Sequence, residues 1–176
     1  MSGRRAVFFD RDGTLMEEVQ YCGDPAKVHV FPGVPEALRK LKAAGFAVIV
    51  ISNQSGIGRG LFTEAQYHAV QEEFLRQAGQ GTIDAAYFCA DPPGVPSSRR
   101  KPEPWMVLEA AADHAIDLAR SFFVGDKSAD IECGRRAGTR TIQVLTGYGA
   151  GQRCEADYVA PDVVHAVRLV LGLTNK

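Results

Sequence analysis

The fold is decided by one stretch of the sequence, AVFFDRDGT, which covers residues 6–14. Its four apolar residues are followed at once by two carboxylates, Asp10 and Asp12. A short apolar run bounded by polar turn residues is typical of a strand that is buried on both faces of a sheet. Ligands of open α/β sheets bind at the carboxyl ends of the strands, so we expect both carboxylates at a functional edge. For this stretch alone, a solvated acidic turn is the plain alternative.

Similar apolar runs recur along the chain and alternate with amphipathic stretches. The further runs are at 47–51, 86–89, 121–124 and 141–145, and the helical stretches are at 35–44, 63–78, 104–114, 129–137 and 163–171. This alternation predicts an α/β fold of the Rossmann-like, three-layer α/β/α type with a central, mainly parallel sheet. The length of 176 residues suits one domain, which we place at 1–176.

The composition excludes several function classes. The net charge of −1 gives no basic surface for nucleic acid, and no apolar run reaches transmembrane length. The four cysteines are scattered, as expected for reduced thiols, and the first residues lack a secretory pattern. We therefore expect a cytoplasmic monomer that binds neither nucleic acid nor a membrane.

Polar groups follow two more of the predicted strands. Ser52 and Asn53 come after the second strand, where a hydroxyl and backbone N–H groups can bind phosphate oxygens, although this is also common turn chemistry. Asp126 and Asp130 follow the strand at 121–124 and suit a hard cation with oxygen ligands. Asp130 could equally cap the next helix.

A cluster of cations, Arg100-Lys101-Pro102, precedes the helix predicted at 104–114. Taken alone it indicates a solvated charge cluster. Taken in order, the DxDGT, Ser-Asn, Lys-Pro and GDxxxD motifs resemble those of the haloacid dehalogenase-like (HAD) phosphatase superfamily over nearly the whole chain. The irregular stretches at 13–31 and 91–104 are too short for a separate cap domain, so the resemblance implies a cap-less member with an open site.

The resemblance implies a nucleophile, an acid–base group and a metal site. Asp10 would attack phosphorus and form an aspartyl-phosphate. Asp12 would protonate the leaving oxygen and later deprotonate the hydrolytic water. Mg²⁺ would be held by the carboxylates of Asp10 and Asp126 and by the backbone carbonyl of Asp12.

Further residues would bind the transferring phosphoryl group. Ser52 and Lys101 supply a donor and a cation for its equatorial oxygens, and Lys101 would also reduce repulsion between Asp10 and the substrate. Asp130 would support the site by orienting Lys101 or the metal shell, and Lys127 is a second supporting residue.

A closer resemblance is to the D-glycero-D-manno-heptose 1,7-bisphosphate phosphatase family, whose members remove the 7-phosphate during synthesis of the heptose used in bacterial lipopolysaccharide. It implies a small phosphorylated sugar as substrate, contacted by Asn53, Arg59 and Arg100, because arginine binds phosphate in bidentate fashion. The motifs that carry it are DRDGT at 10–14, SNQSGIGRG at 52–60, RKP at 100–102 and GDK at 125–127.

Several alternatives stay open. Histidinol-phosphate phosphatase is the nearest relative of that family, and another small phosphosugar phosphatase is also compatible. A nucleic-acid 3′-phosphatase is disfavoured by the near-neutral charge. A non-catalytic phosphate-binding protein would need no general acid, so the presence of Asp12 argues against it.

The sequence departs from the family in one loop. Many members hold a structural zinc there through a Cys-x-His and a Cys-x-Cys pair, but only Cys89 is present, and Asp91, Ser97 and Arg99 fall at the other positions. One cysteine cannot make a thiolate-rich site, so we predict no zinc. Trp105 also replaces a glycine of the family pattern; it could line the pocket or pack against the core, and we expect it to pack against the core.

Overall fold

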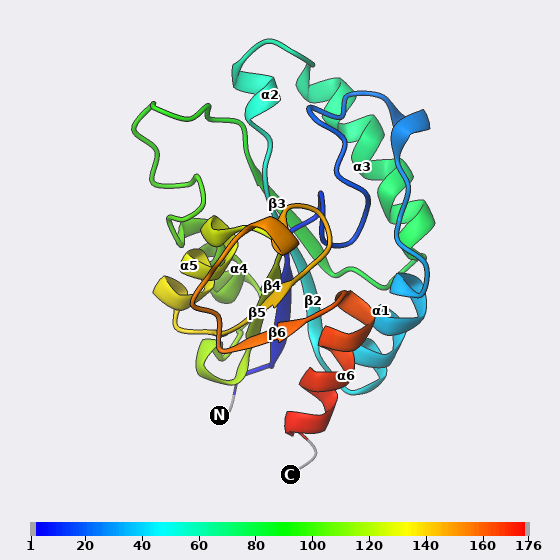
Figure 1. Ribbon diagram of the computed structural model, residues 1–176, viewed down its shortest axis with the longest axis vertical. Coiled ribbons are helices and arrows are strands. Elements are labelled where there is room, and N and C mark those ends of the chain that lie inside the picture. Colours follow the sequence, from blue (N-terminus) through cyan, green and yellow to red (C-terminus); the bar gives the residue numbers. More distant parts are fainter. Residues whose placement is uncertain (1–2, 175–176) are drawn as a thin grey trace.

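A six-stranded sheet lies at the centre of the fold (Figure 1). The computed structural model describes residues 3–174, and within that range the strands are parallel and run in the order β3-β2-β1-β4-β5-β6. Their bounds are β1 (Ala6–Phe9), β2 (Ala47–Asn53), β3 (Ala85–Cys89), β4 (Phe122–Gly125), β5 (Arg140–Val144) and β6 (Tyr158–Ala160). The predicted parallel sheet is confirmed.

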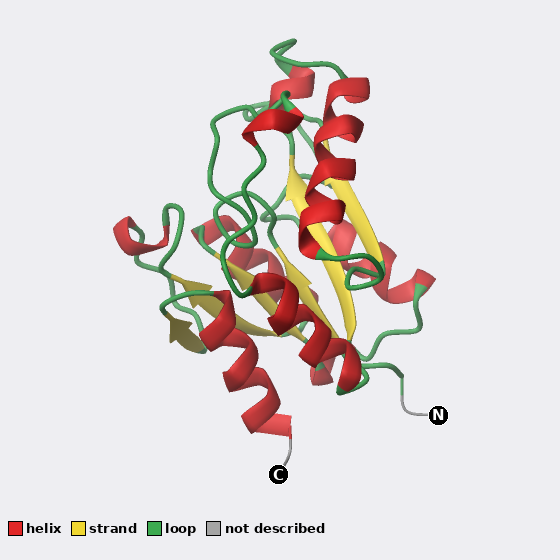
Figure 2. Ribbon diagram, turned by 90° about the vertical axis from the view of Figure 1, so that its right-hand side faces the viewer, coloured by secondary structure: helices red, strands yellow, loops and turns green. Residues whose placement is uncertain are grey.

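Helices cover both faces of this sheet (Figure 2). Helices α1, α3 and α6 pack on one face, and α4 and α5 pack on the other, which confirms the predicted three-layer α/β/α arrangement. The α-helices are α1 (Val34–Ala43), α2 (Ser55–Gly58), α3 (Glu64–Ala78), α4 (Trp105–Asp113), α5 (Ser128–Ala137) and α6 (Val163–Thr174). Short 3₁₀ helices are η1 (Pro25–Lys27), η2 (Leu118–Arg120) and η3 (Gly149–Gly151).

Strand β1 shows why its sequence is apolar without interruption. Val7 and Phe9 point into the core beneath α1, α3 and α6, whereas Ala6 and Phe8 point into the core beneath α4 and α5. All four side chains are fully buried. Side chains alternate between the faces of a strand, so a strand covered on both sides must be apolar at every position. Burial of each phenylalanine contributes about 1.5–3 kcal/mol relative to exposure.

The structure adds elements that the sequence did not predict. Strand β6 extends the sheet beyond β5, and the short helix α2 directly follows β2. The predicted capping box that opens α3 is confirmed, because Thr63 and Gln66 exchange hydrogen bonds of 2.8 and 3.1 Å. Within residues 3–174, the connections at 13–31 and 90–104 contain only η1 as helix, so neither forms a cap over the sheet.

The order of the strands sets the position of the site. The chain winds from β1 through β2 to β3 on one side, then returns to β4 on the other side of β1. Such a switch of direction opens a crevice at the carboxyl ends of the central strands. The predicted domain, 1–176, includes four terminal residues that lie outside the described part of the chain. Among residues 3–174, no helix combines the length and apolar character needed to cross a bilayer.

Candidate active site

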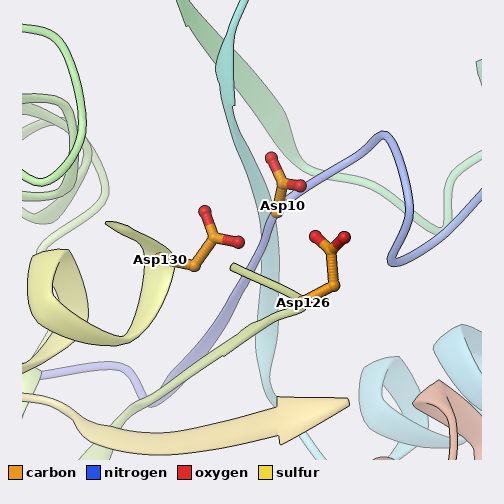
Figure 3. Close-up of side chains that lie close together, drawn as sticks. All are labelled: Asp10, Asp126 and Asp130. Atoms are coloured by element: carbon orange, nitrogen blue, oxygen red, sulfur yellow. The ribbon is translucent and has the colours of Figure 1, made fainter. Parts of the chain in front are cut away.

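Three buried carboxylates meet at the carboxyl edge of the sheet. Asp10 follows β1, Asp126 follows β4, and Asp130 lies in the first turn of α5; Figure 3 shows that their side chains lie close together. One carboxylate oxygen of each lies within 4.8 Å of the others. All three are at most 5% exposed. Residues more than a hundred positions apart therefore converge as the sequence predicted.

Lys101 is the cation at the centre of this cluster. Its Nζ donates to Asp10 Oδ1, to Asp130 Oδ1 and to the carbonyl oxygen of Ile51, each at 2.7 Å. Asn53 holds the backbone of Lys101 on both sides, because its Nδ2 donates to the carbonyl at 3.1 Å and its Oδ1 accepts from the amide at 3.0 Å. The end of β2 thus positions a lysine from a distant loop.

Asp126 is held by the turn after β1 and by the loop after β5. Thr14 Oγ1 donates to its Oδ1 at 3.3 Å, and the backbone amide of Tyr148 donates to its Oδ2 at 2.8 Å. Gly147 has a φ of 54°, and a Cβ atom there would lie 2.2 Å from Asp126 Oδ2. Thr146 Oγ1 ties the same loop to the carbonyl of Gly13 at 2.7 Å. Only glycine fits at 147 without displacing the carboxylate.

The pKa values reflect how charge is distributed in this cluster. Burial alone would raise the pKa of Asp10, but Lys101 and Lys127 together outweigh it and hold that pKa below its usual value. Burial and the charges of Asp10 and Asp130 raise the pKa of Asp126 to about 8. Burial would lower the pKa of Lys101, yet its two carboxylate partners raise it. The site therefore holds a charged lysine, an ionised Asp10 and, in Asp126, a carboxyl group whose ionisation is disfavoured by burial and by its acidic neighbours.

The donor set fits a hard divalent cation. Asp10 Oδ2 is buried and has no hydrogen-bond partner within the described residues. It belongs to the same cluster as Asp126, whose raised pKa reports uncompensated negative charge. Carboxylate oxygens are the ligands that Mg²⁺ prefers, and a buried charge without a partner is costly. Residues 10 and 126 can thus hold such an ion together.

A second network of hydrogen bonds surrounds Asp12. Arg11 Nε and Gln54 Nε2 both donate to Asp12 Oδ2, at 3.0 and 2.9 Å, and Arg11 Nη2 donates to Asp12 Oδ1 at 3.2 Å. Gln54 Nε2 also lies 2.6 Å from Ser52 Oγ. The sequence did not single out Arg11 or Gln54, although both flank predicted site residues directly.

Comparison with known proteins places this geometry in a family. The chain is 37% identical to the D-glycero-D-manno-heptose-1,7-bisphosphate 7-phosphatase of Thermosynechococcus vestitus, over 95% of both chains. It is 36% identical to the D-glycero-beta-D-manno-heptose-1,7-bisphosphate 7-phosphatase of Escherichia coli K12, over 92% of this chain and 89% of that one. The chain belongs to the heptose bisphosphate phosphatase family.

Two further comparisons agree with that assignment. Residues 98–167 match the family model described as HAD-hydrolase-like. The D,D-heptose 1,7-bisphosphate phosphatase of B. bronchiseptica, solved with magnesium and phosphate, superposes with a TM-score of 0.88 at 29% identity, covering 97% of this chain and 99% of that one. The resemblance stated from the motifs, the HAD-like fold and the assignment as a phosphatase are confirmed.

In this phosphatase a cleft of about 280 Å³ opens beside Asp12. Its lining includes Asp12, Asn53, Gln54 and Lys127, together with the segment 18–22. Lys127 spans the cleft, because its Nζ lies 3.2 Å from Glu18 and 4.9 Å from the ring of Tyr148. Asp130 accepts from the Lys127 amide at 3.0 Å, so it also fixes the start of α5.

The two arginines that were predicted to bind substrate make other contacts in the structure. The guanidinium of Arg59 lies 5.6 Å from the ring of Tyr21, which lines the cleft, and Arg100 Nη1 donates to the carbonyl of Asp91 at 3.0 Å. Neither arginine belongs to the lining of the cleft within the described residues. Their roles in binding substrate stay predictions.

The loop that departs from the family is held by hydrogen bonds. Ser97 Oγ donates to Asp91 Oδ2 at 2.6 Å and accepts from the amides of Arg99 and Arg100. The Cys89 thiol lies 3.5 Å from Asp91 and 3.7 Å from Ser97. The absence of zinc stays a prediction. The expected packing of Trp105 was wrong, because this first residue of α4 is 55% exposed.

Proposed function

We propose that the chain is a Mg²⁺-dependent phosphomonoester hydrolase that removes the 7-phosphate of D-glycero-D-manno-heptose 1,7-bisphosphate through an aspartyl-phosphate. The observation that carries this proposal is the buried Asp10, which is ionised beside Lys101 and has one oxygen without a partner among the described residues, in a chain whose relatives bear that activity in their names. A carboxylate nucleophile divides one difficult displacement into two easier ones.

Asp10 and Asp12 divide the chemistry between them. A carboxylate oxygen of Asp10 forms a bond to phosphorus while the bond from phosphorus to the sugar oxygen breaks, and Asp12 gives its proton to that oxygen. Asp12, now a carboxylate, then removes a proton from water as the water oxygen attacks phosphorus. The bond between phosphorus and Asp10 breaks, which releases inorganic phosphate and restores the free Asp10 carboxylate.

Ser52 and Lys101 bind the phosphoryl oxygens during both steps. Lys101 already contacts Asp10 at 2.7 Å, so its charge offsets repulsion between that carboxylate and the incoming phosphate. Asp130 keeps Lys101 in place through its own contact of 2.7 Å. Because both groups are buried, they keep this geometry before substrate arrives.

We propose Asp10, Asp126 and the backbone carbonyl of Asp12 as the residues that hold Mg²⁺. When bound, the ion supplies positive charge that neutralises the carboxylates and the phosphate oxygens. Lys127 supports the site from the rim, since the charges of Asp10, Glu18 and Asp126 outweigh its burial and raise its pKa.

The sugar would occupy the cleft beside Asp12. Asn53 lines that cleft, although its amide groups are engaged with Lys101, while Arg59 and Arg100 would reach the distal phosphate by leaving their present contacts. We further propose that the chain acts as a cytoplasmic monomer in the synthesis of lipopolysaccharide heptose, without a nucleic-acid or membrane partner.

The test is a comparison of substrates. The purified protein with Mg²⁺ is given both anomers of heptose 1,7-bisphosphate, histidinol phosphate and common sugar phosphates, and kcat/KM is measured for each. ³¹P NMR identifies which phosphate of the bisphosphate is released. We expect a heptose bisphosphate anomer to have the highest kcat/KM, with loss at position 7. If histidinol phosphate is hydrolysed best, the proposed substrate is wrong.

A further inference from the structure

Arg11 is the largest side chain that is fully buried in the described part of the protein. All three nitrogens of its guanidinium are engaged. Nε and Nη2 form a fork on the two oxygens of Asp12, at 3.0 and 3.2 Å, and Nη1 donates to Gln71 Oε1 at 3.0 Å. A buried arginine is costly unless it is paired in good geometry, so this arrangement calls for an explanation.

The contacts leave Asp12 with one open position. A carboxylate offers about four acceptor sites, two on each oxygen. Arg11 Nε and Gln54 Nε2 occupy both sites of Oδ2, and Arg11 Nη2 occupies one site of Oδ1. Asp12 lines the cleft and its side chain is 14% exposed. Among the described residues, the acceptor site left open is therefore on Oδ1 of a side chain that lines the cleft.

Helix α3 anchors the arginine from the other side. Gln71 lies on this helix and is buried, and its amide presents Oε1 to Arg11 while Nε2 has no partner among the described residues. The guanidinium also lies 5.5 Å from the ring of Tyr67, on the same helix. A buried unpaired amide nitrogen is costly, so the orientation of Gln71 favours the contact with Arg11 over its own full pairing.

We propose that Arg11 is a positioning residue for proton transfer, which holds Asp12 so that Oδ1 carries the proton that goes to the leaving sugar oxygen. This inference rests on the proposed function, because it gives Asp12 the role of acid and base. The proton leaves Oδ1 as the bond from phosphorus to the sugar oxygen breaks, and the proton taken from water returns to the same oxygen. Arg11 touches neither the phosphate nor the sugar.

The fork explains why an arginine would occupy this place. Its planar guanidinium fixes both oxygens of one carboxylate at the same time. Lysine has a single nitrogen on a flexible stem, so it keeps the charge but does not fix the rotation of the carboxyl group. Arg11→Lys therefore separates the geometry of the contact from its charge.

The test compares two leaving groups. A sugar alkoxide needs protonation when it leaves phosphorus, whereas 4-nitrophenolate leaves without it. We measure kcat/KM of the wild type, Arg11→Lys and Gln71→Met on the best sugar phosphate of the panel and on 4-nitrophenyl phosphate. General acid catalysis is worth about 10²–10⁴-fold, so partial misalignment in Arg11→Lys should cost about 10–100-fold on the sugar phosphate. The loss on 4-nitrophenyl phosphate should stay below about 3-fold by the same reasoning.

Gln71→Met keeps the size of the side chain and Arg11 itself, so it also serves if Arg11→Lys fails to fold. It should lower kcat/KM on the sugar phosphate by several-fold and spare 4-nitrophenyl phosphate. Gln77→Leu is the matched control. Gln77 lies on the same helix and bonds the backbone at Val28 and Val30, so its replacement lowers stability without touching Arg11. Any loss of activity in this control should be equal for both substrates.

Equal losses on both substrates in Arg11→Lys and in Gln71→Met, or no loss in either folded variant, would overturn the role of Arg11. Failure of the proposed function has a different signature. In that case Asp12→Asn would fail to discriminate between the two leaving groups, or the wild type would not prefer the heptose substrate.

Discussion

The two edges of the sheet differ in how the charges of their carboxylates are compensated. At the amino edge, Asp84 precedes β3 and has a partner for each oxygen: Lys42 and Arg4 on one, and the Val48 amide at 2.8 Å on the other. At the carboxyl edge, three carboxylates share Lys101, and Asp10 Oδ2 has no partner among the described residues.

This difference distinguishes a carboxylate that stabilises the fold from carboxylates that serve the proposed function. Asp84 joins strands and a helix with its charge fully compensated, and its pKa is lowered because its cationic and amide contacts outweigh burial. The carboxyl edge keeps negative charge that the chain does not compensate, at a cost in stability. Such a deficit is expected where binding of a cation and a phosphate is to supply the missing interactions. Four substitutions test this comparison.

The largest contrast should be in turnover. Asp10→Asn removes the nucleophile and should lower kcat by at least about 10³-fold, whereas Asp84→Asn should leave kcat unchanged. Phosphate release with Mg²⁺ measures both, and circular dichroism verifies the fold. Substantial turnover by folded Asp10→Asn would show that the carboxyl edge does not work as proposed.

The next effect concerns the glycine that lies against Asp126. A Cβ at position 147 would overlap the Oδ2 atom, so Gly147→Ala should displace a proposed metal ligand. Changes to groups that orient metal ligands typically cost 10–100-fold in affinity, and we expect about that loss for Mg²⁺. Isothermal titration calorimetry measures it directly. Gly151→Ala is the control, because its Cβ would meet no atom within 4 Å. Equal affinities in both variants would contradict the role given to the 146–148 loop.

A smaller effect should appear in stability. Mg²⁺ at about 100 times its Kd should stabilise the wild type by about 2.7 kcal/mol. Because burial and the charges of Asp10 and Asp130 raise the pKa of Asp126 to about 8, the metal-free fold must protonate this carboxyl group at pH 7, which costs stability. Asp126→Asn removes that cost, so the metal-free variant should melt about 2–4 °C higher than the metal-free wild type. It should also respond little to Mg²⁺. Thermal melts with EDTA and with Mg²⁺ measure the difference between the metal-free melting temperatures and the response of each protein to Mg²⁺. A metal-free variant that melts lower than the wild type would mean that repulsion at this edge is not significant.

The smallest effect should come from the amino edge. The lowered pKa of Asp84 means that its ionised form stabilises the fold above its unfolded pKa of about 3.9, and that this stabilisation is lost as pH falls through the folded value. Because the carboxylate is partly exposed, Asp84→Asn should cost about 1 kcal/mol at pH 7. Urea unfolding at pH 7 and below pH 4 measures the difference, which should vanish in acid. A difference that is independent of pH would mean that charge is not its cause.

The sequence predicted the parts of the site that depend on strand ends. Asp10 and Asp126 each follow an apolar run, and parallel strands bring such ends to one edge whatever their separation. The roles of Lys101 and Asp130 were predicted from the resemblance to the family. In the structure the two side chains form an ion pair, which gives a reason for the presence of both. The apolar runs likewise predicted the strands β2, β3, β4 and β5.

Other parts depended on contacts that no local pattern reveals. In the sequence, Arg11 lies between two aspartates, a position typical of a solvated charge. Its burial depends on a contact with Gln71, sixty positions away. Gly147 follows a strand, which is a usable signal, but the need for glycine arises only from its approach to Asp126. Trp105 was expected to pack against the core, yet at the start of α4 it is 55% exposed. Strand β6 has three residues, too few for a visible pattern.

The pairing of β1 with β4 has a consequence during biosynthesis. Val7, Phe8 and Phe9 pair with residues 122–124, so the strand that carries Asp10 finds this neighbour only after most of the chain has been made. At about 5–20 residues per second, the ribosome needs roughly 6–23 s after Asp10 to reach Asp126. For that time one side of the first strand is open, and nascent chains shorter than about 126 residues cannot hydrolyse phosphate by this route.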